Sequence, residues 1–168
     1  SAELRNISSG MIHQNLKQIT SFTNSQNIAC YFPIGSEVDT HDIMLGILQQ
    51  NKNLLLPRIV NDNLEFCIIE NLEKLEKGSF EIMEPKDSCK KAEKINCVLI
   101  PTVGVSTSGV RLGYGKGYYD RFLSSTNAVK ISLTYSKQIV KSIPSDSHDI
   151  KIDWIITEDK TVKISQVS

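Results

Sequence analysis

Apolar residues recur at helical spacing over the first twenty positions of the chain. This spacing predicts an amphipathic helix with apolar positions Leu4, Ile7, Met11, Ile12, Leu16 and Ile19. A second helix is expected after Asp39 and Thr40, because either side chain can cap a helix start and apolar residues follow at helical spacing. A short third helix is expected from Ser136 to near Pro144.

Short, mainly apolar runs predict the strands of a sheet. These runs cover residues 28–32, 54–56, 64–69, 97–100, 130–135 and 154–156. Pro57 and Pro101 directly follow two of the runs and are expected to end those strands. Strands that are apolar throughout are buried on both faces, as in parallel sheets covered by helices. We therefore predict one α/β domain over residues 1–168, with three layers in the order α/β/α and a mostly parallel sheet.

Composition narrows the class of protein. The chain has 168 residues, is 40% hydrophobic and 23% charged, and carries 19 basic and 19 acidic side chains, for a net charge of zero. This composition excludes a disordered chain and argues against a broad basic surface for nucleic acid. No apolar run approaches the roughly 20 residues of a membrane-spanning helix, and the first residues do not resemble a signal peptide. We expect neither nucleic acid nor a membrane as a partner.

The spacing and surroundings of the four cysteines indicate a reducing compartment. Cys30, Cys67, Cys89 and Cys97 form no C-x-x-C pair, so their spacing suggests neither a zinc ribbon nor a thioredoxin-like site. All but Cys89 lie within apolar segments, where a free thiol usually behaves as a small core residue. We expect all four to be reduced and structural, and the protein to be cytoplasmic.

Glycine, basic and tyrosine residues cluster around position 115. Five of the nine glycines fall between Gly104 and Gly117, and residues 111–121 read R-L-G-Y-G-K-G-Y-Y-D-R. Glycine at every second position allows positive φ angles, so that backbone N–H groups can converge on an anion. Arg111 and Lys116 add cations for phosphate oxygens. The stretch, with three basic side chains against one acidic, predicts a phosphate-binding loop.

A helix is expected directly after this loop. Tyr118, Tyr119, Phe122 and Leu123 resume helical spacing, and a helix N-terminus favours phosphate. Asp120 is the one carboxylate in this basic stretch. It suits a ligand of the Mg²⁺ that accompanies a nucleotide.

A glycine-rich surface turn with ordinary charges around it is the alternative to a binding loop. Two cations, a carboxylate and three tyrosines within eleven residues favour binding. The stretch matches neither common phosphate motif. A Walker A loop requires Ser or Thr where Gly117 stands, and a dinucleotide fingerprint requires its third glycine where Tyr118 and Asp120 stand.

The run R-L-G-Y-G-K-G-Y-Y-D-R-F-L over residues 111–123 resembles the signature of the 5-formyltetrahydrofolate cyclo-ligase family. Other stretches resemble that family in the same order, at residues 31–33, 37–40, 56–58, 84–85, 100–104, 138–144, 148–149 and 153–158. The resemblance implies a three-layer α/β ligase that uses ATP and Mg²⁺ to convert 5-formyltetrahydrofolate to 5,10-methenyltetrahydrofolate, releasing ADP and phosphate. In that family the formyl oxygen takes the γ-phosphoryl group, N10 attacks the activated carbon, and phosphate leaves. We expect the protein to act on these two small molecules as a monomer.

The resemblance also implies roles for individual residues. The ATP loop would comprise Arg111, Leu112, Gly113, Tyr114, Gly115, Lys116, Gly117, Tyr118 and Tyr119. Those that would also face the folate are Tyr114, Gly115, Lys116, Gly117 and Tyr118. Asp120 and Asp149 would hold Mg²⁺. Phe32 would pack on the pterin ring, and Glu37 would hydrogen-bond the amino-nitrogen edge of that ring.

Without the resemblance, several of these residues have simpler interpretations. Phe32 closes a buried strand and suits the core, Glu37 follows a Pro-Gly loop and suits the surface, and Asp149 suits a plain turn. Arg58 follows Pro57 and can reach a phosphate or the glutamate tail of a folate, or simply lie on the surface.

The start of the chain departs from the family pattern. The family begins with a helix whose Lys-x-x-x-Arg pair touches ATP, and here Ser1 stands where the lysine belongs if Arg5 is the arginine. The segment from Arg5 to Glu37 is shorter than in the family by roughly four helical turns, at about 3.6 residues per turn. We therefore expect the chain to lack the family's first helix, which leaves Arg5 as a weak candidate for ATP contact.

Two other functions fit the same residues. The first is a folate-binding module that holds 5-formyltetrahydrofolate without turning it over, which the missing lysine favours. The second is a different small phosphotransferase that uses the same glycine-rich loop.

Overall fold

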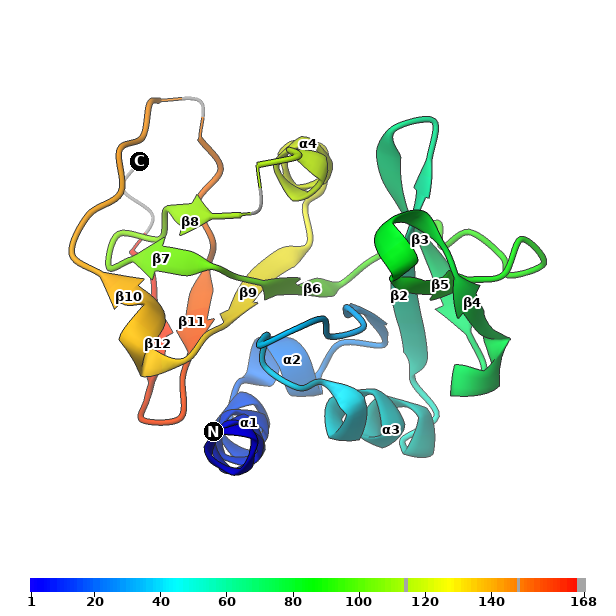
Figure 1. The fold of residues 1–168 in the computed structure, drawn as a ribbon, viewed down its shortest axis with the longest axis horizontal. Coiled ribbons are helices and arrows are strands. Elements are labelled where there is room, and N and C mark those ends of the chain that lie inside the picture. The colour runs from blue at the N-terminus through cyan, green and yellow to red at the C-terminus, as the bar shows by residue number, and fades with distance from the viewer. Residues whose placement is uncertain (114, 148, 166–168) are drawn as a thin grey trace.

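The helices of the chain lie mainly in its first third (Figure 1). A computed structural model describes residues 1–113, 115–147 and 149–165. The helices in these ranges are α1 (Ala2–Leu16), α2 (Thr20–Thr23), α3 (His41–Gln49) and α4 (Tyr118–Ser124). Three of them confirm the helices predicted at the chain start, after Thr40 and after the glycine-rich loop. Thr40 is the N-cap residue of α3, and Oδ1 of Asp39, one residue earlier, accepts the N–H of His41 at 2.9 Å. Within the described ranges, none of the helices has the length and hydrophobicity that crossing a bilayer requires.

A mostly parallel sheet forms the centre of the molecule. Within the described ranges its seven strands lie in the spatial order β12 (Thr161–Lys163), β11 (Trp154–Ile156), β9 (Val129–Leu133), β6 (Cys97–Pro101), β1 (Asn27–Ala29), β2 (Asn53–Val60) and β3 (Asn63–Ile69). Neighbours from β11 to β2 pair in parallel, and the edge strands β12 and β3 pair antiparallel. This topology confirms the predicted α/β fold.

Smaller sheets complete the architecture. One has the order β10 (Ile139–Val140), β7 (Gly104–Ser106) and β8 (Arg111–Leu112), and the other pairs β4 (Leu75–Lys77) with β5 (Met83–Pro85). Short 3₁₀ turns lie at Leu72–Lys74, Ser79–Glu81 and Ser136–Gln138. The strands of these smaller sheets were not predicted, because they are short and, unlike the short strands β1 and β11, do not coincide with one of the apolar runs.

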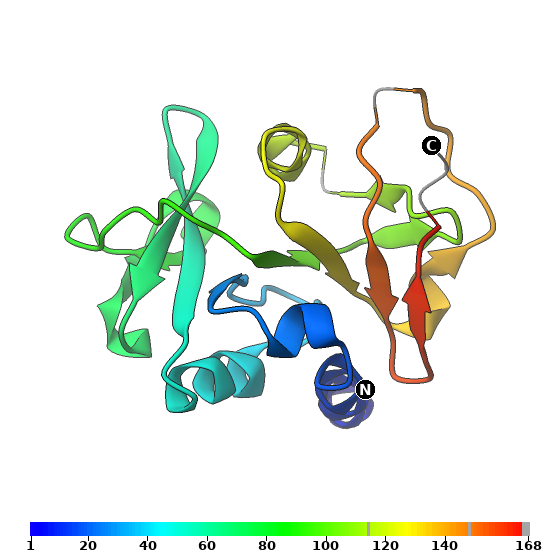
Figure 2. The same ribbon diagram turned by 180° about the vertical axis from the view of Figure 1, so that it is seen from behind.

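Both faces of the central sheet are covered. Figures 1 and 2 show α1, α2 and α3 on one face, and α4 with the β7–β8 strands on the other. Leu54 and Leu56 of β2 join the core beneath α1 and α3, whereas Leu55 joins the core beneath α4. In β6, Leu99 likewise joins the core beneath α1 and α3, and Val98 joins the core beneath α4. The strands are apolar throughout because alternate side chains enter two different cores.

The prediction that Pro57 ends its strand is wrong, because β2 continues to Val60. Cys30 donates its N–H to the carbonyl of Leu55, so the backbone groups of Leu55 face β1. Backbone groups alternate along a strand, so Pro57 also faces that side, where β1 has already ended. The N–H that proline lacks is therefore not needed there, and Pro57 pairs with Phe66 of β3 on its other side.

The predicted helix from Ser136 to Pro144 is also wrong. Ser136–Gln138 forms one 3₁₀ turn, and the chain then enters β10. The side chain of Gln138 accepts the N–H of Tyr135 at 2.9 Å, and Glu158 accepts the N–H of Ser136 at 2.8 Å. These side chains close the turn, and Ile139 then pairs with β7 in place of continuing a helix.

Burial of the cysteines predicts how their thiols react in the native protein. All four are free, and burial raises the pKa of Cys30 to about 12 and that of Cys67 and Cys97 to about 11. We expect native protein at about pH 8 to expose only the half-buried Cys89 to a thiol reagent, and denatured protein to expose all four. Since unfolded thiols ionise near 8.5, their contribution to stability is present below that pH and is lost as pH rises toward 11. Rapid labelling of four thiols in the native state would contradict this expectation.

Candidate active site

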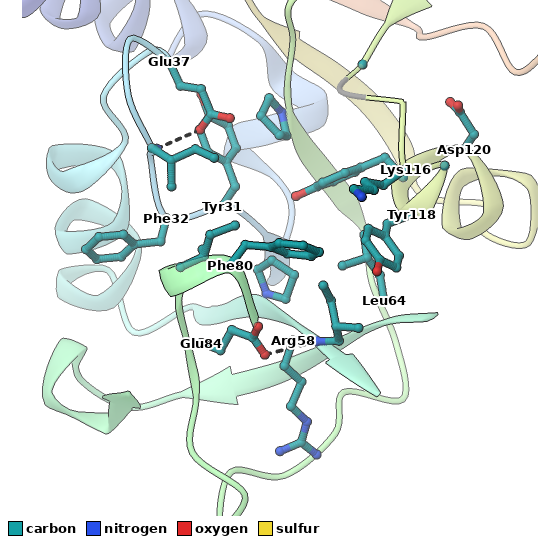
Figure 3. Close-up of a pocket in the computed structure, with 18 of the residues that line it drawn as sticks. Tyr31, Phe32, Glu37, Arg58, Leu64, Phe80, Glu84, Lys116, Tyr118 and Asp120 are labelled. Carbon is teal, nitrogen blue, oxygen red and sulfur yellow. Dashed lines mark hydrogen bonds between the residues drawn. The ribbon is translucent and has the colours of Figure 1, made fainter. Parts of the chain in front are cut away.

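A cavity of about 460 Å³ opens at the carboxyl ends of β1 and β6. The chain leaves β1 toward β2 and leaves β6 toward β9, so the strand order reverses between them. Such a switch point is where open α/β sheets bind ligands. The lining residues are Tyr31, Phe32, Ile34, Glu37, Pro57, Arg58, Ile59, Leu64, Phe80, Ile82, Met83, Glu84, Pro101, Arg111, Leu112, Gly113, Gly115, Lys116, Gly117, Tyr118, Tyr119 and Asp120 (Figure 3 draws most of them).

The glycine-rich loop forms one wall of this cavity. It connects β8 to α4, and Gly115 and Gly117 adopt φ angles of 87° and 74°. Side chains are strained at such angles, which explains glycine at these two positions. Gly117 immediately precedes α4, so the loop leads into a helix N-terminus as predicted. Tyr114 lies outside the described residues, and the structure brings all the other predicted loop residues to the cavity.

The buried side chain of Arg111 connects the glycine-rich loop to neighbouring elements. Its side chain is 6% exposed, its Nε donates to the carbonyl of Pro101 at 3.0 Å, and its Nη1 lies 3.6 Å from Oδ1 of Asp120. The guanidinium carbon also lies 5.2 Å from the centroid of the Tyr119 ring. These contacts join the end of β6, the loop and the first turn of α4.

The side chains of Lys116 and Phe80 lie next to each other at the mouth of the cavity. Nζ of Lys116 lies 5.4 Å from the centroid of the Phe80 ring, a cation–π distance, and both side chains are exposed (Figure 3). Phe80 comes from the 3₁₀ turn Ser79–Glu81, which lies between β4 and β5. The lysine is therefore held beside an aromatic surface at the cavity mouth.

The turn that carries Phe80 is strained. Phe80 and Glu81 have φ angles of 59° and 62°, and each such angle costs about 1–3 kcal/mol unless the surroundings fix it. The carboxylate of Glu84 accepts the N–H of Ser79 at 2.8 Å and that of Ile59 at 3.2 Å, so it fastens the turn to β2. The sequence did not predict Phe80 in the site, because a single aromatic residue in a charged segment carries no local signal.

The tip of the β2–β3 hairpin contacts α4. Asn61 and Asp62 both have positive φ angles, as in a two-residue hairpin turn. The hydroxyl of Tyr118 donates to Oδ1 of Asp62 at 3.1 Å, and Nη2 of Arg121 donates to the carbonyl of Asp62 at 2.8 Å. Arg121 also donates to the carbonyl of Lys116 at 3.2 Å. An Asn-Asp pair between two strands signals the turn, but not its contact with α4.

Glu37 and Phe32 lie on the wall opposite the loop. The carboxylate of Glu37 accepts the N–H of Ile34 at 2.9 Å and lines the cavity. Phe32 is half-buried, with its ring 4.9 Å from that of His41 in an edge-on arrangement. Burial, with Glu37 as a nearby negative charge, raises the pKa of Tyr31 and of Tyr119 well above the usual value. Both phenols are therefore neutral hydroxyls at neutral pH.

Asp149 and Arg5 do not lie in this cavity. Asp149 is exposed in a turn, where its Oδ2 accepts the N–H of Asp146 at 2.8 Å, and it lines a separate polar cavity that also includes Lys130 and Asp153. Arg5 is exposed on α1, which lies on the face of the sheet opposite to α4 (Figures 1 and 2). Neither residue lines the cavity that the glycine-rich loop forms.

Arg58 lines the cavity but turns its guanidinium away from its centre (Figure 3). Its Nη2 lies 3.3 Å from the carboxylate of Glu65, and its Nη1 donates to the carbonyl of Lys86 at 3.2 Å. The side chain therefore ties β2 to β3 and to the segment after β5.

The exposed carboxylate of Asp120 at the cavity edge is compatible with Mg²⁺. Among the described residues, no three His, Cys, Asp or Glu side chains gather closely enough to hold a metal by themselves. Asp120 is 72% exposed at the cavity edge. Magnesium usually takes one or two protein carboxylates together with substrate phosphates, so the donor set here suits an ion that arrives with a nucleotide.

Comparison with known proteins yields relatives along nearly the whole chain. A sequence model of the 5-formyltetrahydrofolate cyclo-ligase family matches residues 1–158. The mouse 5-formyltetrahydrofolate cyclo-ligase is 29% identical over 175 residues, with 95% of this chain and 86% of the mouse protein covered. The enzyme of the same name from Mycoplasma genitalium is 31% identical over 164 residues, with 92% and 89% covered.

Solved structures agree with these relatives. The 5,10-methenyltetrahydrofolate synthetase of Aquifex aeolicus is 32% identical, with a TM-score of 0.89 over 100% of this chain and 87% of that one. The synthetase of Mycoplasma pneumoniae is 28% identical, with a TM-score of 0.75 over 94% of this chain and 89% of that one. The likeness holds in both sequence and fold, and it extends across the cavity described above. The chain belongs to the 5-formyltetrahydrofolate cyclo-ligase family.

Proposed function

We propose that this protein converts 5-formyltetrahydrofolate and ATP to 5,10-methenyltetrahydrofolate, ADP and phosphate. One observation carries the proposal beyond family membership. A single cavity joins the glycine-rich loop, with Lys116 at its mouth, to the opposite wall that carries Glu37 and Phe32. Its volume lies in the range of small-molecule sites, and its lining is largely apolar with a few polar groups, as such sites require.

The chemistry follows from holding two substrates in one cavity. The formyl oxygen attacks the γ-phosphorus of ATP, and the bond to the β-phosphate oxygen breaks to release ADP. N10 then attacks the activated formyl carbon, loses its proton, and phosphate leaves with the former formyl oxygen. Backbone N–H groups of the loop and the Lys116 ammonium would hold the phosphates, and Glu37 would accept hydrogen bonds from the amino-nitrogen edge of the pterin. Positioning and charge stabilisation supply most of the catalysis of such a transfer.

Asp120 is the proposed protein ligand of Mg²⁺. When bound, the ion would neutralise phosphate charge as the phosphoryl group transfers. Asp120 lies in the first turn of α4, next to the loop, and its exposed carboxylate can reach a nucleotide at the cavity edge. Asp149 lines the separate polar cavity and is not part of this proposed ligand set.

An absorbance assay coupled to ADP measurement tests the proposal directly. Purified protein with ATP, Mg²⁺ and 5-formyltetrahydrofolate should form the methenyl chromophore and ADP in equal amounts. If neither product appears while a family relative is active in parallel, the proposal fails. Folate binding in a calorimeter without ADP formation would favour the folate-binding module, and ADP formation without folate would favour a different phosphotransferase.

The proposal includes a monomeric enzyme of the cytoplasm. The four free thiols favour a reducing compartment. Light scattering at micromolar concentration should report a mass near the 18.8 kDa of one chain. A stable dimer would refute this part of the proposal without affecting the reaction.

Asp120→Asn should weaken the dependence on Mg²⁺. The amide keeps the shape of the side chain but loses the charge, so we expect kcat/KM for ATP to fall by about tenfold and half-maximal activity to need more Mg²⁺. Asp149→Asn serves as the comparison variant, because that residue lies in the separate polar cavity. An unchanged magnesium titration in Asp120→Asn would remove Asp120 from the ligand set.

A further inference from the structure

Three buried hydroxyls bind the backbone of three consecutive residues beside the cavity. The hydroxyl of Tyr135 donates to the carbonyl of Glu37 at 3.3 Å, and that of Tyr31 donates to the carbonyl of Val38 at 2.9 Å. The N–H of Asp39 donates to Oγ of Ser9 at 3.0 Å. The backbone of residues 37–39 is therefore fixed at successive positions by side chains.

These hydroxyls come from segments far apart in the sequence. Ser9 lies on α1, Tyr31 follows β1, and Tyr135 follows β9. Ser9 and Tyr135 are 5% and 4% exposed, and their oxygens lie 3.3 Å apart. Loss of either hydroxyl would remove a hydrogen bond that holds residues 37–39 and one partner of the buried hydroxyl that remains.

The hydrogens of this pair have a defined order. Tyr135 uses its hydrogen on the carbonyl of Glu37, and Ser9 accepts from Asp39. A hydrogen bond between the two hydroxyls then requires Ser9 as the donor, since the single hydrogen of Tyr135 is already used. The two hydroxyls thus link the N–H of Asp39 to the carbonyl of Glu37 through three consecutive hydrogen bonds. This network holds the backbone of residues 37–39 in its conformation.

We infer that Ser9 and Tyr135 are positioning residues that set folate affinity by fixing the backbone of Glu37. The inference rests on the proposed function and deepens it. Neither side chain lines the cavity, so each acts through Glu37, whose carboxylate does. A carboxylate on a fixed backbone loses less conformational entropy when the substrate binds than one on a mobile backbone. Folate affinity should therefore be higher when the two hydroxyls hold this backbone.

Tyr135→Phe is the central test. It removes one oxygen and keeps the ring that lies under Lys137. We expect kcat/KM for 5-formyltetrahydrofolate to fall about threefold to tenfold through KM, with KM for ATP unchanged. Ser132→Ala is the matched control, because Ser132 is a buried hydroxyl on β9 that lies 2.6 Å from the hydroxyls of Thr102 and Thr134, away from residues 37–39. This control should lower stability without a selective change in KM for folate.

A double-mutant cycle separates positioning from a general effect on the fold. If Tyr135 acts through Glu37, its removal should cost much less in a Glu37→Gln background than in the wild type. Additive losses would overturn the inference. So would a Tyr135→Phe variant in which both KM values move together, as a merely structural role predicts.

A measurement without ligand keeps the inference testable if the enzyme proves inactive. Amide hydrogen exchange at Asp39, whose N–H binds Ser9, should be faster in Tyr135→Phe and in Ser9→Ala than in the wild type and Ser132→Ala. Absence of turnover by the wild type would defeat the proposed function alone. Unchanged exchange at Asp39 in both variants would defeat the positioning role alone.

Discussion

Replacing Lys116 with alanine is expected to lower kcat/KM for ATP by about 10- to 100-fold, the usual loss for a hydrogen bond to a charged group. Lys116 lies at the mouth of the cavity, on the loop in which Gly115 and Gly117 adopt positive φ angles. Arg111, the other cation of the loop, already binds Pro101 and Asp120 from a buried position. Lys116 is therefore the cation that we propose for the phosphate.

The chain offers a matched control for this variant. Lys163 on β12 also lies over an aromatic ring, with Nζ 5.9 Å from the centroid of Trp154, but outside the cavity. Lys163→Ala should leave the kinetics unchanged, so any effect of losing a lysine–aromatic contact on stability is measured separately. An unaltered KM for ATP in Lys116→Ala would show that the phosphate role is wrong.

Glu37→Gln is expected to lower kcat/KM for 5-formyltetrahydrofolate by about 10- to 100-fold, again the loss for a charged hydrogen bond. The amide oxygen can still accept the N–H of Ile34, so the loop should keep its shape. The charge that would face the amino-nitrogen edge of the pterin is lost, and the amide presents a donor where an acceptor is needed. We expect the effect in the KM for folate and not in that for ATP.

Thermal unfolding and substrate comparison make this second result decisive. The melting temperature of Glu37→Gln should stay close to that of the wild type, because the N–H of Ile34 keeps its acceptor. A folate with its pterin amino group removed should discriminate little between the variant and the wild type. Equal losses for ATP and folate would instead indicate a distorted cavity and would contradict the assigned role.

Hydrophobic pattern predicted the middle of the central sheet because strands such as β6 and the first half of β2 are buried on both faces. Leu54, Leu55 and Leu56 read as one apolar run for that reason, although they enter two cores. The end of the strand could not be predicted, because whether Pro57 is tolerated depends on where the neighbouring strand stops. Such information belongs to the pairing of strands and is absent from a local window of sequence.

The candidate site was predictable where chemistry is concentrated in the sequence and not where the fold assembles it. The loop from Arg111 to Asp120 carries its glycines, cations and carboxylate within ten positions. Phe80 reaches the same cavity through a strained turn held by Glu84, a contact between a loop and the edge of β2 that no spacing rule describes. Asp149, placed in the site by resemblance alone, lies in a different cavity in this structure.

The contact between the β2–β3 hairpin and α4 should make one wall of the cavity sensitive to ionic strength. Asp62 and Arg121 are exposed, and exposed ion pairs contribute little and weaken as salt screens them. The opposite wall is held by buried hydroxyls, which salt does not reach. Rising salt should therefore loosen the wall formed by α4 and the glycine-rich loop before the wall that carries Glu37, in addition to screening the exposed charge of Lys116. With ATP at the loop and the folate at the opposite wall, as proposed, the KM values for the two substrates should respond differently to ionic strength.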